Sequence, residues 1–106
     1  MREIFAEELS TLLRENNKNI TLLDVREPWE TEVCQISGST HIRMIEIHNR
    51  LNELDMEAEI VVLCHYGIRS RQAAGFLEAN GFSQVCNLVG GIDAWAMSVE
   101  PAMARY

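Results

Sequence analysis

The chain alternates between two patterns of apolar residues, one typical of buried strands and the other of amphipathic helices. Short runs rich in apolar and β-branched residues predict strands at residues 20–25, 60–64 and 85–89, with a very short one at 40–42. Apolar residues spaced three or four positions apart predict helices at residues 5–16, 44–54, 69–79 and 92–99. Pro28 opens a further short helix, since proline is favoured at the first helical position.

Turn-forming residues separate these segments. We expect ends of helices near residues 16–17 and 80–81 and at Pro101, a turn at 37–39, and a helix start after 90–91. Strands that alternate with helices predict an α/β fold in which a mostly parallel sheet has helices on both faces. Because the chain holds no repeat, low-complexity tract or linker, residues 1–106 are expected to form one domain.

In such a sheet, ligands bind beyond the carboxyl ends of the strands. Asp24, Val25 and Arg26 lie at one predicted strand end, and Cys64 lies at another. Asp24 and Arg26 either form an internal ion pair that fixes the loops or line the site. We favour structural support for Asp24, and for Arg26 both interpretations stay open.

Composition limits the partners and the location. The 106 residues carry a formal net charge of −7, which argues against a surface for nucleic acid or for an anionic membrane. No apolar run approaches the ~20 residues of a membrane span, and the acidic start of the chain is unlike a secretory signal. Three cysteines without a CxxC pair are typical of reduced thiols, so we expect a cytoplasmic location.

The segment Cys64-His65-Tyr66-Gly67-Ile68-Arg69-Ser70 stands between a predicted strand and a predicted helix. The free N–H groups at a helix start, and the positive end of its dipole, favour a thiolate, a persulfide or a bound anion there. Gly67 permits a tight turn that can aim several N–H groups at the sulfur. The alternative for Cys64 is a small buried apolar side chain, but the residues after it favour a nucleophile.

Candidate binding groups follow Cys64. We assign substrate binding to His65, Tyr66, Gly67, Ile68, Arg69 and Ser70. The Arg69 guanidinium suits the oxygens of a sulfonate or a phosphate, whereas the alternative is a solvated helix face; anion binding is favoured for Arg69 and only weakly for Arg71. Ser70 is expected to cap the helix rather than to donate to the sulfur.

Outside this segment the chemistry-bearing residues have simpler explanations. We expect structural or surface roles for His41 and His48, and packing roles for Trp29 and Trp95. Neither the histidines nor the other two cysteines have metal-ligand spacing, so no zinc site is predicted.

Four segments combine into a recognisable pattern. They are residues 22–27, with Asp-Val-Arg-Glu; 38–42, with Gly-x-x-His-Ile; 64–70, with Cys-x-x-Gly-x-Arg-Ser; and 81–95, with Gly-Gly and a tryptophan. Together they resemble the single-domain rhodanese family over nearly the whole chain, the last two segments being the specific ones. The chain departs from the family at Ser37 and Arg43, where prolines are usual, and we expect these departures to affect local rigidity more than activity.

The resemblance implies a rhodanese-like, mostly parallel five-stranded sheet and a thiosulfate sulfurtransferase that works through a Cys64 persulfide. The Cys64 thiolate would attack the outer sulfur of thiosulfate, displace sulfite, and pass the sulfur to cyanide or to a thiol such as thioredoxin. Arg69 would hold the sulfonate, and the N–H groups of residues 65–70 would stabilise the anionic persulfide. No metal or organic cofactor is implied, because sulfur itself is the carried group.

Two other functions stay open. A cysteine phosphatase or arsenate reductase has one more residue in its loop than the four that separate Cys64 from Arg69, and the shorter loop suits a sulfur atom better than a phosphate. The second alternative function is that of a non-catalytic interaction or regulatory module, since a fold does not establish a function. The presence of Cys64 argues for the enzyme, because inactive relatives commonly lack this cysteine.

Overall fold

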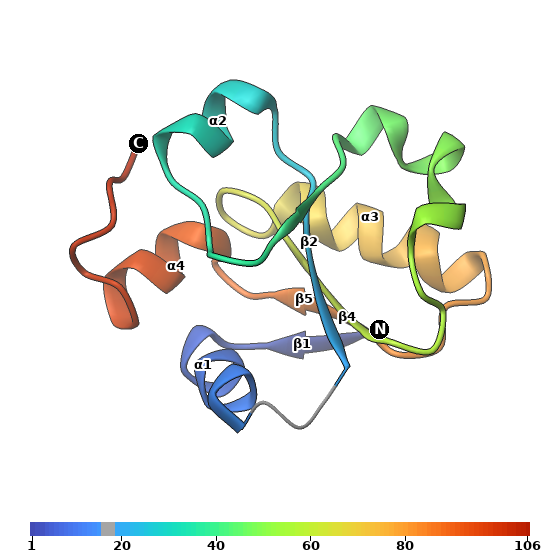
Figure 1. Ribbon diagram of the computed structural model, residues 1–106, viewed down its shortest axis with the longest axis horizontal. Coiled ribbons are helices and arrows are strands. Elements are labelled where there is room, and N and C mark those ends of the chain that lie inside the picture. Colours follow the sequence, from blue (N-terminus) through green and yellow to red (C-terminus); the bar gives the residue numbers. More distant parts are fainter. Residues whose placement is uncertain (16–18) are drawn as a thin grey trace.

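A five-stranded parallel sheet forms the centre of the computed structural model, which describes residues 1–15 and 19–106 (Figure 1). Its strands are β1 (Arg2–Ile4), β2 (Ile20–Asp24), β3 (Thr40–His41), β4 (Glu59–Leu63) and β5 (Val85–Leu88). They lie in the order β1-β5-β4-β2-β3, and every neighbouring pair is parallel. The predicted α/β fold with a parallel sheet is therefore confirmed.

Helices cover both faces of this sheet, as the alternating pattern predicts. They are α1 (Ala6–Glu15), α2 (Pro28–Val33), α3 (Ile68–Ala79) and α4 (Gly91–Ser98), with two short 3-10 helices, η1 (Met44–Asn49) and η2 (Leu51–Glu53). Successive residues of a strand point to opposite faces, so Val61 packs with α1 and α4 while Val62 packs with α3 and η1. These two apolar layers supply the main driving force for folding.

Some features differ from the sequence-based expectations. Strand β1 has no counterpart in the apolar pattern, because only Ile4 of its three residues is buried at this edge of the sheet. In place of the one helix expected over residues 44–54, two 3-10 helices form, η1 and η2, and the chain leaves helical geometry between them at Arg50 (φ −126°, ψ 18°). Trp29 is 59% exposed and does not pack in the core, whereas Trp95 is buried. The end of the first helix expected near residues 16–17 lies outside the described residues.

The carboxyl ends of β2 and β4 lie side by side. Asp24 is in register with Leu63, and the Val25 N–H donates to the Leu63 carbonyl oxygen across 3.1 Å. The segments that follow these two strands therefore start at the same end of the sheet, where the strands have their carboxyl ends. No helix within residues 1–15 and 19–106 is both long and apolar enough to cross a membrane.

Candidate active site

Cys64 directly follows β4, and its side chain is almost fully buried. The main-chain N–H groups of Gly67 and Ser70 point at its sulfur, with N···Sγ distances of 3.1 and 3.4 Å. Both donors belong to the turn that starts α3, where the helix dipole adds positive potential. The sulfur therefore lies in a place that favours negative charge, although apolar side chains surround much of it.

The turn after Cys64 depends on Gly67. This residue precedes the first residue of α3 and has φ +100°, a conformation that residues with a Cβ rarely adopt. A Cβ added there would also lie 3.2 Å from both the Gly90 nitrogen and the Leu88 carbonyl oxygen. The predicted role of Gly67 in a tight turn is confirmed, and the close packing against β5 and α4 adds a second reason for glycine.

The start of α4 holds the other side of the cysteine segment. The N–H groups of Ile92 and Asp93 donate to the carbonyl oxygens of Cys64 and His65, across 2.9 and 3.2 Å. Gly91 lets the two backbones approach, because a Cβ at this position would overlap both carbonyl groups. This anchoring function was not predicted, since the Gly-Gly pair indicates only a helix start.

Ser70 does not cap α3, so the capping expectation is wrong. It is the third residue of the helix, and its buried hydroxyl lies 3.3 Å from the Cys64 sulfur and 2.5 Å from Asn87 Oδ1. The Asn87 amide in turn donates to the Gly67 carbonyl oxygen across 3.2 Å. Sequence reasoning missed Asn87, although one polar side chain in a buried strand run is a usable signal.

Arg69 faces a carboxylate of the protein itself. Its two terminal nitrogens each lie 2.8 Å from one oxygen of Glu30, a buried residue of α2. The same carboxylate accepts hydrogen bonds from the Glu27 N–H, at 2.9 Å, and from the Tyr106 hydroxyl, at 2.8 Å. The hydrogen bonds from Arg69 outweigh the effect of burial and lower the pKa of Glu30 to about 2.

Asp24 and Arg26 form a fully buried ion pair beside this cluster. Arg26 Nη2 lies 2.7 Å from Asp24 Oδ2, and the guanidinium also donates to the carbonyl oxygens of Glu30 and Cys34. It donates to the Tyr106 hydroxyl as well, across 3.0 Å. Of the two interpretations left open for Arg26, the geometry fits the internal ion pair that fixes loops.

Aromatic rings form the outer part of the site. The His65 ring stacks between the rings of Tyr66 and Tyr106, with a centroid distance of 3.8 Å on each side. Tyr66 and Ile68 are exposed, so both lie at the surface beside Cys64. Burial raises the pKa of Tyr106 to about 12. No sequence pattern predicts that Tyr106, in the tail after α4, joins this cluster.

The remaining candidates have local partners. His41 Nε2 lies 2.6 Å from the Arg26 carbonyl oxygen, in keeping with a structural role, and His48 is exposed. Arg71 is exposed and pairs with Glu3 across 3.0 Å. Within the described ranges, no three His, Cys, Asp or Glu side chains are grouped so that they could hold a metal ion.

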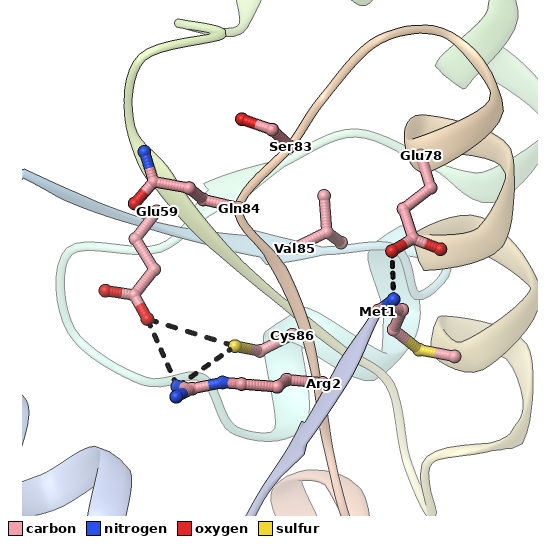
Figure 2. A pocket seen from close by; sticks show the side chains of 8 residues that line it. All are labelled: Met1, Arg2, Glu59, Glu78, Ser83, Gln84, Val85 and Cys86. Carbon is pink, nitrogen blue, oxygen red and sulfur yellow. Dashed lines mark hydrogen bonds and ion pairs between the residues drawn. The ribbon is translucent and has the colours of Figure 1, made fainter.

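A separate hollow lies at the amino ends of β4 and β5, at the end of the sheet opposite Cys64 (Figure 2). Arg2 Nη2 lies 3.3 Å from Glu59 and 3.6 Å from the sulfur of Cys86. Burial raises the pKa of the Cys86 thiol. None of the residues assigned to the site from the sequence lines this hollow.

The chain is similar to rhodanese-like proteins over most of its length. The family model described as Rhodanese-like domain matches residues 5–98. The thiosulfate sulfurtransferase GlpE of Pseudomonas aeruginosa (strain LESB58) is 38% identical over 97 residues, covering 92% of this chain and 86% of GlpE. YrkF of Bacillus subtilis (strain 168) is 38% identical over 86 residues, 81% of this chain, which spans only 46% of YrkF. The crystal structure of a rhodanese-like domain protein from Staphylococcus aureus superimposes with a TM-score of 0.84 at 34% identity, covering 90% of this chain and 91% of that one.

Proposed function

Since this chain belongs to the rhodanese-like sulfurtransferase family, we propose that it transfers sulfane sulfur through a persulfide on Cys64. One observation carries the proposal: the Cys64 sulfur faces the N–H groups of Gly67 and Ser70 at the start of α3. Hydrogen bonds to an ionised acceptor are stronger than those between neutral groups. These donors therefore favour the thiolate that attacks and the persulfide anion that results.

In the loading step, the Cys64 thiolate attacks the outer sulfur of a donor. With thiosulfate, a new S–S bond forms on Cys64, the S–S bond of the donor breaks, and sulfite leaves with the electron pair. The cysteine is left as a persulfide anion. No resident metal or organic cofactor takes part, because the carried group is bound covalently to the protein.

In the unloading step, a thiophilic acceptor attacks the outer sulfur of the persulfide. Cyanide leaves as thiocyanate, or a thiolate such as that of reduced thioredoxin leaves as a persulfide, and the Cys64 thiolate is restored. The fixed carbonyl groups of Cys64 and His65, held by the start of α4, keep the loop in one geometry through both steps.

A steady-state assay tests this function. The protein is mixed with a sulfur donor and cyanide, and thiocyanate formation is followed for the wild type, Cys64→Ser and the control Cys86→Ser. We expect turnover with the wild type and the control, and none above background with Cys64→Ser. If Cys64→Ser retains full turnover, or if the wild type turns over no donor while it binds a protein partner, the sulfurtransferase proposal is wrong and the interaction module is favoured.

A further inference from the structure

The arginines around Cys64 are already neutralised by carboxylates of the protein. Arg69 pairs with Glu30 through both terminal nitrogens, and Arg26 pairs with Asp24. These two guanidinium groups and two carboxylates together carry no net charge, and all of them except Arg69 are buried. The nearby Arg71 is likewise paired, with Glu3.

Glu30 is held too well to be displaced easily from Arg69. Each carboxylate oxygen accepts two hydrogen bonds, at distances of 2.8 and 2.9 Å on one oxygen and 2.8 Å on the other. A sulfonate that took the terminal nitrogens of Arg69 would leave a buried carboxylate without its main cationic partner. The Arg69 side chain is 38% exposed, but the Glu30 carboxylate is buried, and leaving a buried carboxylate without its cationic partner is unfavourable.

The surface beside Cys64 suits an organic donor better than an inorganic anion. Tyr66 is 57% exposed and Ile68 is 74% exposed, and the stacked ring of His65 lies between Tyr66 and Tyr106. Aromatic faces and an aliphatic side chain contact the carbon skeleton of a ligand favourably.

Resting on the proposed function, we infer that Glu30 is a specificity-determining residue that selects organic persulfides over thiosulfate as sulfur donors. By occupying Arg69, Glu30 withholds the guanidinium from a donor oxyanion. An organic persulfide, R–S–SH, needs no such contact, because its inner sulfur carries no oxygens. The Cys64 thiolate attacks the outer sulfur, the S–S bond of the donor breaks, and the thiolate R–S⁻ leaves, while Cys64 keeps the transferred sulfur and its proton.

The test compares kcat/KM for glutathione persulfide and for thiosulfate in the wild type and in Glu30→Gln. We expect the wild type to prefer glutathione persulfide. Glu30→Gln should raise kcat/KM for thiosulfate about tenfold, through a lower KM, and change that for the persulfide by less than about twofold; tenfold corresponds to ~1.4 kcal/mol. A wild type that prefers thiosulfate, or a Glu30→Gln variant with an unchanged donor ratio, would overturn the inference.

The matched control is Glu53→Gln, because Glu53 forms a similar two-pronged pair with Arg50, at 2.8 Å for each contact, on the exposed helix η2. This variant makes the same change of net charge outside the site and should keep the donor ratio of the wild type. An equal shift of the ratio in Glu53→Gln would assign the effect to net charge and overturn the role of Glu30.

Arg69→Gln keeps the inference testable if Glu30→Gln does not fold. If Arg69 is a partner of Glu30 only, its loss should change kcat/KM for both donors by the same factor. A loss confined to thiosulfate would show that Arg69 binds the sulfonate and that Glu30 does not exclude it. Failure of both donors to load sulfur on wild-type Cys64 would instead contradict the proposed function itself.

Discussion

The N–H of Ile92 donates a hydrogen bond to the carbonyl oxygen of Cys64 across 2.9 Å, so the first turn of α4 fixes the segment that carries the sulfur. This contact requires the two backbones to lie close together, and Gly91 is the residue that allows it. Two segments far apart in the sequence thus build one rigid loop.

Gly91→Ala should displace that loop. The added Cβ meets the carbonyl groups of Cys64 and His65, and the residue has φ +61°, where a side chain is strained. We expect a loss of ~1–3 kcal/mol in the free energy of unfolding, the typical cost of such strain, together with at least a tenfold loss of sulfur transfer. Urea unfolding and the thiocyanate assay measure the two effects.

The control is Gly75→Ala, an exposed position of α3 where an added Cβ has open space. Alanine there should stabilise the helix by ~0.5–1 kcal/mol and leave turnover unchanged. Wild-type activity in Gly91→Ala would show that the anchoring by α4 is dispensable.

The three cysteines should differ in their rates of alkylation at neutral pH. Cys64 faces two N–H donors, whereas burial raises the pKa of the Cys86 thiol and leaves less of it ionised. We expect iodoacetamide to modify Cys64 faster than Cys34 and Cys86, as followed by mass spectrometry of the peptides. One common slow rate for all three would contradict an activated thiolate.

Glu30 should make the stability of the wild type sensitive to acid. Its pKa of about 2 in the folded state lies below the ordinary value of 4.5, so ionised Glu30 stabilises the fold fully above pH 4.5. This contribution disappears as the pH falls toward about 2. The difference in unfolding free energy between wild type and Glu30→Gln should therefore shrink over that interval, in urea titrations at each pH. A constant difference would mean that the carboxylate is not held as an anion by Arg69.

Tyr106→Phe should destabilise the protein, although the phenylalanine ring can still stack on His65. The hydroxyl donates to Glu30 and accepts from Arg26, at 2.8 and 3.0 Å, so its loss leaves two buried charged groups short of a partner. The expected cost is ~1–3 kcal/mol. Tyr66→Phe, at an exposed ring of the same stack, should change stability by less than ~0.5 kcal/mol. Equal effects of the two variants in urea unfolding would contradict the role given to the Tyr106 hydroxyl.

Much of the fold could be predicted because its signals are local. The apolar run before Cys64 gives β4, and Gly67 marks the turn into α3. Strand β1 escaped prediction because its pairing with β5, Arg2 beside Cys86, is a long-range contact that leaves little apolar pattern in three residues.

Only the part of the site that lies in one continuous segment of the chain could be predicted. Cys64 and its turn are contiguous in the chain, so their geometry follows from a strand, a glycine and a helix start. Glu30 and Tyr106 reach the cluster from α2 and from the chain's last residue, and only the tertiary structure places them against Arg69 and Arg26. The anion partner of Arg69 was therefore expected to be a substrate, whereas the fold supplies a carboxylate.

Mass spectrometry of the intact protein and of its peptides, after brief exposure to a sulfane-sulfur donor and removal of the excess, tests sulfur transfer through Cys64 most directly. The account predicts a gain of one sulfur atom on the peptide that contains Cys64, its loss on addition of cyanide, and no gain in Cys64→Ser. A protein that gains no sulfur from either thiosulfate or glutathione persulfide, or that gains it on another cysteine, would contradict the account.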